Sequence, residues 1–289
     1  MKPPAFAYHD PRSVAETVDL LARLENARLL AGGQSLMPML NMRVALPDHL
    51  IDLNRVAGLA GIRLEGETLH IGTMTRQRVL EDNPDVRERC PLLAEALTYV
   101  GHRQTRNRGT LGGSLCNLDP SAELVAVSAA LDAIVEVMGP AGIRDLPMAD
   151  FVLGLMTPAI GTDEMVVGVR LPLWPQGHGY CFMEFARRHG DFAIASAAVL
   201  LRQDAADRIT RASVTLGGVG VAPVRMRDVE ALLIGQAPSD HLFREAAAKC
   251  GTIEAIGDVH VPGWYRQRLA SVLVRRALGT ALARAEARH

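Results

Sequence analysis

Two pairs of glycines are the residues most suited to holding an anion. The first pair lies in Ala31-Gly32-Gly33-Gln34-Ser35-Leu36, between a predicted strand and a predicted helix. Paired glycines let the backbone approach a ligand closely, and the N–H groups at a helix start favour a phosphate. One such interaction contributes only about 0.3–1 kcal/mol, so several donors must converge to hold a nucleotide. By itself, this pair is more typical of a tight turn.

The second pair lies in Thr110-Leu111-Gly112-Gly113-Ser114-Leu115-Cys116-Asn117-Leu118-Asp119-Pro120-Ser121-Ala122-Glu123. Here the glycines stand beside hydroxyl and amide donors, and the Glu123 carboxylate can accept hydrogen bonds from ribityl or ribose hydroxyls. Just upstream, Arg103, Arg106 and Arg108 supply positive charge, although the same segment also fits a solvated basic loop. Two such loops about eighty residues apart favour one diphosphate that is held from two sides.

These motifs resemble those of the FAD-binding medium subunit of the molybdenum hydroxylases, the family of carbon monoxide dehydrogenase, nicotine dehydrogenase and xanthine dehydrogenase. The resemblance covers essentially the whole chain. It rests on the first glycine loop and on Gly101-His102-Arg103-Gln104-Thr105-Arg106-Asn107-Arg108-Gly109-Thr110-Leu111-Gly112-Gly113-Ser114-Leu115. Further support comes from Arg187-Arg188-His189-Gly190-Asp191-Phe192-Ala193, Tyr265-Arg266 and Arg275-Arg276-Ala277-Leu278.

The resemblance implies an α+β fold. A two-subdomain FAD-binding domain of the vanillyl-alcohol-oxidase-like (PCMH) class precedes a smaller α+β C-terminal domain. Both glycine loops would contact the FAD diphosphate. The residues that it assigns to these loops are Gly32, Gly33, Gln34, Ser35, Leu36, Thr110, Leu111, Gly112, Gly113, Ser114 and Asn117. Glu123 stands where relatives often have Asp, so its contact to FAD would be longer.

The resemblance also places the segment that contains Asp191 and Phe192 near the isoalloxazine ring, where it would control the access of an electron acceptor. Phe192 fits equally as the first core residue of the following strand. Neither glycine loop contains a histidine, so we expect non-covalent FAD and no catalytic role for His102. Trp264, before Tyr265, is bulkier than the resemblance leads us to expect.

In this family the flavin carries the redox chemistry, and the protein sets its position, potential and exposure. The resemblance implies an electron-transfer subunit without catalytic side chains or metal ligands of its own. A large subunit would carry the molybdenum cofactor and a small subunit two [2Fe–2S] clusters, in a dimer of heterotrimers. Electrons would pass from the clusters through FAD to a quinone, NAD or another acceptor. A stand-alone FAD-dependent oxidase or reductase and a non-catalytic nucleotide-binding protein are the alternatives.

The elements around the first loop have a β-α-β-α-β order. We expect strands at 5–8, 28–31 and 49–53, with helices from Ser13 and from near Ser35. Ser13-Val14-Ala15-Glu16 has the spacing of a capping box, and apolar residues recur behind it at helical spacing. This order predicts a small, partly parallel α/β unit over residues 1–57.

Antiparallel pairing is expected after residue 58. Hairpins are predicted at 62–72 and 133–147, a helix at 91–100 and a strand at 164–171. The segment 172–179 contains two prolines and two glycines and is the best linker candidate. We therefore expect a second FAD-binding subdomain at 58–173 and a C-terminal domain at 178–289. In that last domain we expect strands at 180–186, 193–202 and 209–216, then helices at 226–234, 240–250 and 264–287.

Composition and charge limit the possible partners. The chain has 289 residues, is 48% hydrophobic and has a net charge of −1, so no global field favours nucleic acid or anionic lipid. Cys90, Cys116, Cys181 and Cys250 form no Cys-x-x-Cys pair, which indicates reduced, packed thiols rather than zinc or iron–sulfur ligands. No signal region or integral membrane segment is recognisable in the sequence, so we expect a cytoplasmic protein.

Two further patterns predict structure rather than chemistry. Gly218-Val219-Gly220 begins like a dinucleotide fingerprint, but Pro223 and its context predict a loop that ends a strand. The last helix carries several arginines, for which we expect the solvated or subunit-facing side. These are Arg266, Arg268, Arg275, Arg276 and Arg284.

Overall fold

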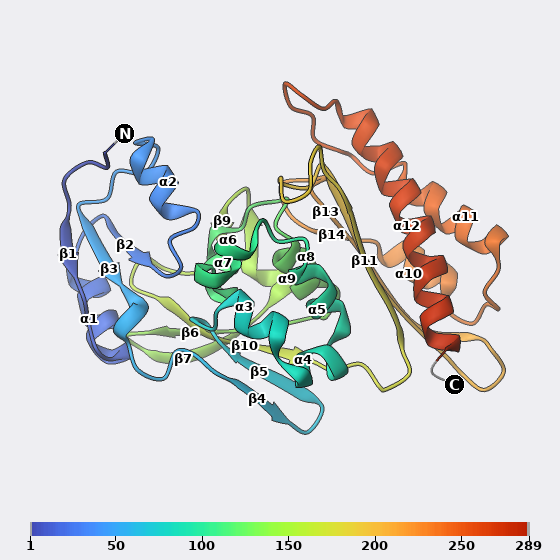
Figure 1. Ribbon diagram of the computed structural model, residues 1–289, viewed down its shortest axis with the longest axis horizontal. Helices are drawn as coiled ribbons and strands as arrows, with labels where there is room; N and C mark the ends of the chain where they lie inside the picture. Colours follow the sequence, from blue (N-terminus) through green and yellow to red (C-terminus); the bar gives the residue numbers. More distant parts are fainter. Residues whose placement is uncertain (1, 288–289) are drawn as a thin grey trace.

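The computed structural model describes residues 2–287 and contains three sheets in succession along the chain, together with a two-stranded hairpin (Figure 1). The first sheet is parallel, with strand order β1-β3-β2. Its elements are β1 (Ala7–His9), α1 (Val14–Arg23), β2 (Ala27–Leu30), α2 (Leu36–Asn41), β3 (His49–Asp52) and the short 3-10 helix η1 (Leu53–Arg55). The predicted β-α-β-α-β order is therefore confirmed, and the sheet, predicted as partly parallel, is parallel throughout.

Helix α1 begins as its sequence predicts. The Ser13 hydroxyl accepts a hydrogen bond from the Glu16 N–H at 3.1 Å, and the Glu16 carboxylate accepts one from the Arg12 N–H. These bonds satisfy N–H groups near the helix start that have no partner within the helix. Val18 and Leu21 are buried against the first sheet, so one face of α1 covers it.

The middle of the chain forms an antiparallel sheet of order β4-β5-β10-β6-β7, so the predicted antiparallel pairing is confirmed. Its strands are β4 (Ile62–Glu65), β5 (Thr68–Gly72), β6 (Ile134–Gly139), β7 (Gly142–Pro147) and β10 (Met165–Pro172), and β8 (Val152–Gly154) pairs with β9 (Thr157–Pro158). Its helices are α3 (Gln77–Asp82), α4 (Pro84–Arg89), α5 (Pro91–Leu97), α6 (Arg103–Arg108), α7 (Leu111–Asn117), α8 (Glu123–Ala130) and α9 (Met148–Phe151).

The segment Pro172–Gly179 connects this sheet to the next one, but it is not an exposed linker. Trp174 and His178 are buried, and the Arg211 guanidinium lies 4.1 Å from the Trp174 ring centroid. Such cation–π contacts stabilise by about 0.5–2 kcal/mol. The two prolines and two glycines therefore end the flanking strands without leaving the connection in solvent.

The C-terminal sheet is antiparallel, with order β11-β12-β13-β14. Its strands are β11 (Gly179–Phe185), β12 (Ala195–Gln203), β13 (Ile209–Gly217) and β14 (Val224–Arg225), and three helices follow: α10 (Arg227–Leu233), α11 (Asp240–Cys250) and α12 (Gly263–Glu286). These helices lie on one face of the sheet, as Figure 1 shows. The predicted order of strands followed by helices is confirmed.

Both faces of the C-terminal sheet are covered. Ala197 and Val199 belong to the core formed with α10, α11 and α12, whereas Ala198 and Leu200 belong to the core formed with α5 and α8. The row of buried residues along β12 follows from this position, because a strand between two layers has no solvent side. The middle and C-terminal parts of the chain therefore share one hydrophobic core.

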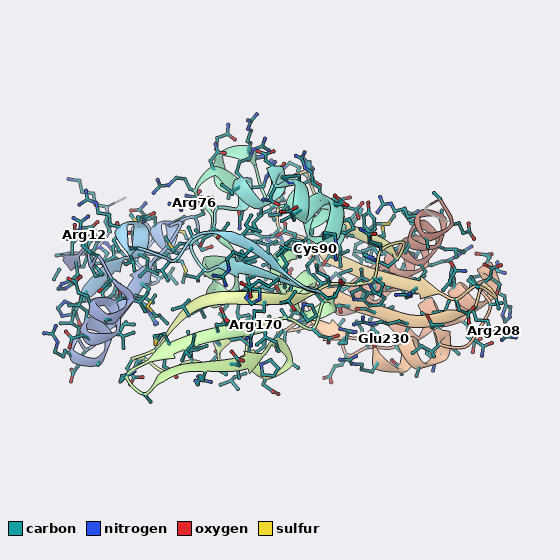
Figure 2. All side chains as sticks on the ribbon, turned by 90° about the horizontal axis from the view of Figure 1, so that it is seen from below. Arg12, Arg76, Cys90, Arg170, Arg208 and Glu230 are labelled. Atoms are coloured by element: carbon teal, nitrogen blue, oxygen red, sulfur yellow. The ribbon has the colours of Figure 1, made fainter. Side chains whose placement is uncertain are left out.

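The four cysteines are free thiols, and three of them, Cys90, Cys181 and Cys250, are buried (Cys90 is labelled in Figure 2). Burial raises the pKa of each of the four thiols to about 12. Because the thiolate is the reactive form, we expect no cysteine to react with a thiol reagent in the native protein at about pH 8. All four should react after unfolding in guanidinium. Rapid labelling of a native thiol would contradict the packing described here.

Candidate functional site

The structure brings the two glycine loops into direct contact. A Cβ atom on Gly32 would lie 2.8 Å from the Gly109 Cα atom and closer still to the Arg108 carbonyl oxygen. A Cβ atom on Gly113 would lie 3.3 Å from the Ala31 Cβ atom. Only glycine allows an approach of this kind between two backbones. The predicted meeting of the two loops is therefore present in the fold.

The first loop carries a row of backbone donors without partners. Within residues 2–287, the N–H groups of residues 32–36 donate no hydrogen bond to another group of the chain, whereas the Met37 N–H bonds to the Gly33 carbonyl. Gly33 has φ +74°, a left-handed conformation that favours glycine. Successive free N–H groups in such a turn form an anion-binding concavity.

The second loop is fixed by hydrogen bonds and by packing against the protein interior. Thr110 caps α7 by accepting a hydrogen bond from the Gly113 N–H at 3.1 Å, and the Gly112 N–H donates to the Thr73 carbonyl at 3.0 Å. Leu111 and Gly112 are buried, and a Cβ atom on Gly112 would overlap the Thr73 side chain. Gly112 therefore serves close packing against the end of β5.

The outward side of α7 carries the groups that remain available. Gly113, Ser114 and Asn117 are partly exposed, and in the described chain no hydrogen bond involves the Ser114 hydroxyl or the Asn117 amide. These positions follow one another at helical spacing, so they lie on the same face. A hydroxyl and an amide beside a row of free N–H groups suit the oxygens of a diphosphate and its attached hydroxyls.

A set of hydrogen bonds through Arg76 and Asn54 links the two loops and was not predicted from the sequence. The Arg76 guanidinium donates to the Arg108 carbonyl and, at 2.5 Å, to Asn54 Oδ1; Asn54 Nδ2 in turn donates to the Ala31 carbonyl at 3.1 Å. Arg76 lies where the first unit meets the middle of the molecule (Figure 2). Burial and the neighbouring Arg108 charge lower the pKa of Arg76. No sequence motif marks Arg76 or Asn54, because neither belongs to a glycine loop.

The basic segment before the second loop is helix α6, not a solvated loop. Arg106 is buried and forms two hydrogen bonds to the Glu81 carboxylate, at 2.7 and 3.2 Å. Burial tends to raise the pKa of Glu81, but the hydrogen bonds from Arg106 and Arg78 hold it below its usual value. The Arg106 charge is therefore already paired within the protein. Arg103 and Arg108 are exposed.

Glu123 is the first residue of α8 and is 8% exposed. Burial, followed by repulsion from Asp119, raises its pKa to about 7, although a hydrogen bond from its own N–H and the Arg106 charge oppose this rise. Its carboxyl group can therefore change its charge near neutral pH.

The segment 187–193 lies against the start of α6. A Cβ atom on Gly190 would be 2.8 Å from His102 Cε1, and Gly190 has φ +85°. Asp191 forms an ion pair with Arg188 at 3.3 Å. Phe192 is 71% exposed, so its alternative interpretation as a core residue of the next strand is wrong.

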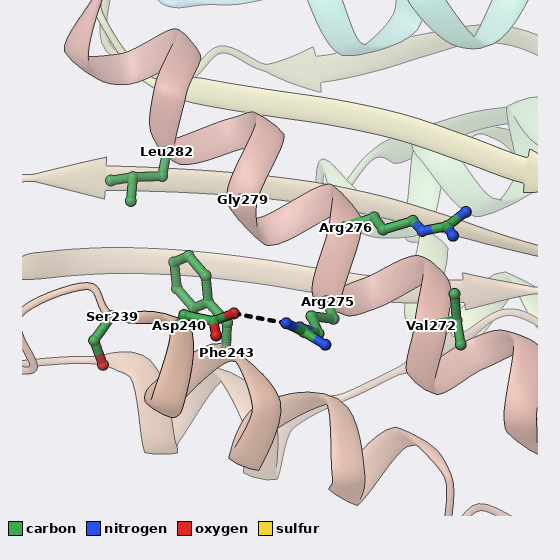
Figure 3. A pocket seen from close by; sticks show the side chains of 8 residues that line it. All are labelled: Ser239, Asp240, Phe243, Val272, Arg275, Arg276, Gly279 and Leu282. Atoms are coloured by element: carbon green, nitrogen blue, oxygen red, sulfur yellow. Dashed lines mark hydrogen bonds and ion pairs between the residues drawn. The ribbon is translucent and has the colours of Figure 1, made fainter.

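Other features of the described chain do not form a competing centre. A hollow of about 700 Å³ lies between α11 and α12, where Arg275 is paired with Asp240 at 2.9 Å (Figure 3). Among residues 2–287, no group of three or more His, Cys, Asp or Glu side chains is placed to hold a metal ion. In the same range, no helix has the length and apolar character needed to cross a membrane.

Two family models match the chain in succession. Residues 4–174 match the FAD binding domain in molybdopterin dehydrogenase, and residues 180–281 match the CO dehydrogenase flavoprotein C-terminal domain. The 6-hydroxypseudooxynicotine dehydrogenase complex subunit alpha of Paenarthrobacter nicotinovorans is 39% identical over 99% of this chain and 97% of its own length. The carbon monoxide dehydrogenase medium chain of Hydrogenophaga pseudoflava is 38% identical over 98% and 99%, respectively.

Solved structures agree with these matches. A structure of carbon monoxide dehydrogenase from Hydrogenophaga pseudoflava has a chain that superposes with a TM-score of 0.95 at 39% identity, covering 98% of this chain and 99% of that one. A chain of quinoline 2-oxidoreductase from Pseudomonas putida 86 superposes with a TM-score of 0.94 at 33% identity, covering 99% of each. The predicted α+β architecture, with an FAD-binding part before a C-terminal domain, is confirmed.

Proposed function

The chain belongs to the FAD-binding medium subunits of the molybdopterin dehydrogenases, and from this premise we propose that it transfers electrons through FAD within a molybdenum hydroxylase complex. It is thus an oxidoreductase subunit with an FAD-binding domain. When bound, FAD supplies the ability to accept single electrons and to release them as a pair. The protein's own groups bind the cofactor, orient it and limit its exposure.

The row of free N–H groups at residues 32–36, in contact with the second glycine loop, is the observation that carries this proposal. It fits a diphosphate, because each free donor can meet a phosphate oxygen without giving up a bond inside the protein. Around it we propose the predicted cofactor residues. They are Gly32, Gly33, Gln34, Ser35, Leu36, Thr110, Leu111, Gly112, Gly113, Ser114, Asn117, Glu123, Asp191 and Phe192.

The members of this set have different roles. Gly33 and its neighbours offer N–H groups, Ser114 and Asn117 offer side-chain donors and acceptors, and Leu111 and Gly112 support the second loop from within. Asp191 and the exposed Phe192 would flank the flavin ring. Binding is non-covalent, since no histidine lies in either loop.

We extend the proposal to the partners. A large subunit with the molybdenum cofactor and a small subunit with two [2Fe–2S] clusters would complete a heterotrimer, two copies of which would form the complex. Exposed large apolar side chains are available for contacts with these partners. Those with more than half of their surface exposed include Val44, Leu46, Leu153, Leu155, Phe192, Val259 and Trp264.

We also propose the domain boundaries that the sequence predicts, with FAD held between residues 1–57 and 58–173 and a C-terminal domain over 178–289. Four unpaired thiols fit a reducing compartment, which supports a cytoplasmic location. The hydroxylated substrate would bind to the large subunit and is therefore not encoded in this chain.

The test is the visible spectrum and metal content of the protein purified natively with its accompanying chains. We expect a flavin band in this chain and iron and molybdenum in the others. Flavin without metals or partners would instead show a stand-alone flavoenzyme. A colourless chain that does not take up added FAD would contradict the proposal and favour a non-catalytic nucleotide-binding protein.

A further inference from the structure

A half-buried carboxyl group, that of Glu184, lies on the C-terminal sheet, on the face that packs against the FAD-binding part. Glu184 on β11 is paired in register with Ser196 on β12, and Ser196 is paired with Gly217 on β13. Residues directly opposite in neighbouring strands project to the same side of a sheet. Phe182, two residues before Glu184, belongs to the core shared with α5 and α8, so this row faces those helices.

The contacts of Gly217 show what lies opposite the row. A Cβ atom on Gly217 would lie 3.2 Å from the Ala126 Cβ atom of α8 and 2.5 Å from Ser196 Oγ. The Gly218 N–H donates to the Pro120 carbonyl at 2.8 Å, which fixes the segment before α8 against the end of β13. The start of α8, where Glu123 is buried, therefore adjoins the Glu184–Ser196 end of the sheet.

Two polar atoms in this place have no partner. Within the described chain, Glu184 Oε2 and Ser196 Oγ are buried and form no hydrogen bond, and Ser196 is only 1% exposed. An ionised carboxylate is unfavourable where one of its oxygens is buried and receives no hydrogen bond. A protonated carboxyl is not, because it is neutral and can itself donate a hydrogen bond.

The surroundings of Glu184 and Glu123 also favour the protonated form of Glu184. Burial, followed by repulsion from Glu123, raises the pKa of Glu184 to about 8. The Asp119 charge adds repulsion at Glu123, and the Arg106 charge opposes it. Burial and negative charges that include Glu184 raise the pKa of Tyr99. Ionising both carboxyl groups in this place costs free energy, because the two negative charges repel each other.

We propose that Glu123 and Glu184 together carry one negative charge at neutral pH, where the start of α8 meets the C-terminal sheet, and that Glu184 is a positioning residue that sets the charge that Glu123 presents to FAD. This inference rests on the proposed function. With Glu184 protonated, Glu123 is free to be the carboxylate that accepts a hydrogen bond from a cofactor hydroxyl. With both ionised, the junction holds an extra negative charge beside an anionic cofactor.

The inference predicts a maximum in FAD affinity as pH changes. Below about pH 7 Glu123 also gains a proton, and above about pH 8 Glu184 loses its own, so FAD binding weakens on both sides. Each limb involves one proton and approaches a tenfold change in Kd per pH unit. The measurement is a fluorescence titration of the full-length, flavin-free chain with FAD at a series of pH values.

Single substitutions show which carboxyl group causes the loss of FAD affinity at low pH (the acid limb) and which causes the loss at high pH (the alkaline limb). In E184Q, which retains the size of the side chain but cannot ionise, we expect the alkaline limb to vanish and the acid limb to remain. In E123Q we expect the acid limb to vanish and the affinity to fall about tenfold, consistent with the loss of one charge-assisted hydrogen bond. Glu254→Gln, at an exposed position of the same domain, should leave both limbs unchanged.

A second readout needs neither FAD nor a variant. The infrared spectrum of the flavin-free chain should contain the carbonyl band of a protonated carboxyl near pH 7, and this band should disappear above about pH 8. Its absence, or an alkaline limb that persists in E184Q, would overturn the proposed protonation of Glu184. If the wild-type chain binds no FAD at any pH, the proposed function fails instead.

Discussion

Replacement of Gly32 by alanine is expected to weaken FAD binding about a hundredfold. The new Cβ atom would lie 2.8 Å from the Gly109 Cα atom and against the Arg108 carbonyl, so the two glycine loops must separate. Both obstructing atoms are backbone, which cannot rotate aside as a side chain can. Overpacking of this kind costs about 1–3 kcal/mol, and the upper end corresponds to two powers of ten in Kd.

The measurement is the Kd for FAD of the full-length variant, together with its unfolding midpoint. Gly279→Ala is the matched control, since it adds the same methyl group on the exposed side of α12, where a Cβ atom would meet nothing within 4 Å. Its affinity should equal that of the wild type. If Gly32→Ala binds FAD normally, the contact between the loops does not shape the site.

The second large effect is expected from Arg266→Met. The sequence predicts this arginine on the solvated or subunit-facing side of the last helix, and that prediction is wrong: Arg266 is 6% exposed and lies inside the chain's own fold. Its guanidinium donates to the carbonyls of Ile194, at 2.5 Å, and Gly218, at 2.6 Å, and pairs with Asp258. It thereby joins α12 to the residues just before β12 and just after β13.

Removing the guanidinium would leave two buried carbonyls without donors, so we expect a loss of about 3 kcal/mol in the free energy of unfolding. Chemical denaturation of the full-length chain measures it. The control is Arg268→Met, two positions along the same helix at an exposed site, for which we expect a change within about 0.5 kcal/mol. Equal losses in the two variants would refute the assigned role of Arg266.

Arg284 shows why charges on that helix were misjudged. It donates two hydrogen bonds to the Glu95 carboxylate, at 2.8 and 2.9 Å, although 189 residues separate the two in sequence. A sequence shows that an arginine is present at a helical position but not which carboxylate the fold brings to it. Arg106, Arg266 and Arg284 therefore resemble the exposed Arg268 until the chain is folded.

The strands and their pairing were predicted far better. Alternation of apolar and polar residues, glycines at turns and the cap at Ser13 are local signals, and each is read from a few neighbouring residues. The two glycine loops were found for the same reason. The short helices α3, α4 and α7 were not predicted, since each spans only six or seven residues and is held by tertiary contacts.

Arg76, Asn54 and Glu184 were missed because their importance depends on neighbours that are distant in the sequence. Arg76 reaches the Arg108 carbonyl 32 residues away, and Glu184 acquires its environment from the register of β11 with β12. A lone arginine after a strand, or a glutamate within one, has no distinguishing local pattern. The sequence alone therefore locates the backbone N–H groups that can bind an anion. It does not locate the side chains that link the two loops or that set the charge beside them.

The first unit of the fold contributes the free N–H groups, yet its core is small. Among residues 2–287, only eight buried side chains form that cluster, and Leu59, Met74 and Met165 come from the middle part of the chain. A unit with few buried contacts of its own opens more readily than the rest of the molecule. A ligand that binds the closed form suppresses such opening in proportion to its saturation. The fraction of chains with bound FAD and the slowing of amide hydrogen exchange in residues 7–55 are therefore two measures of one binding equilibrium.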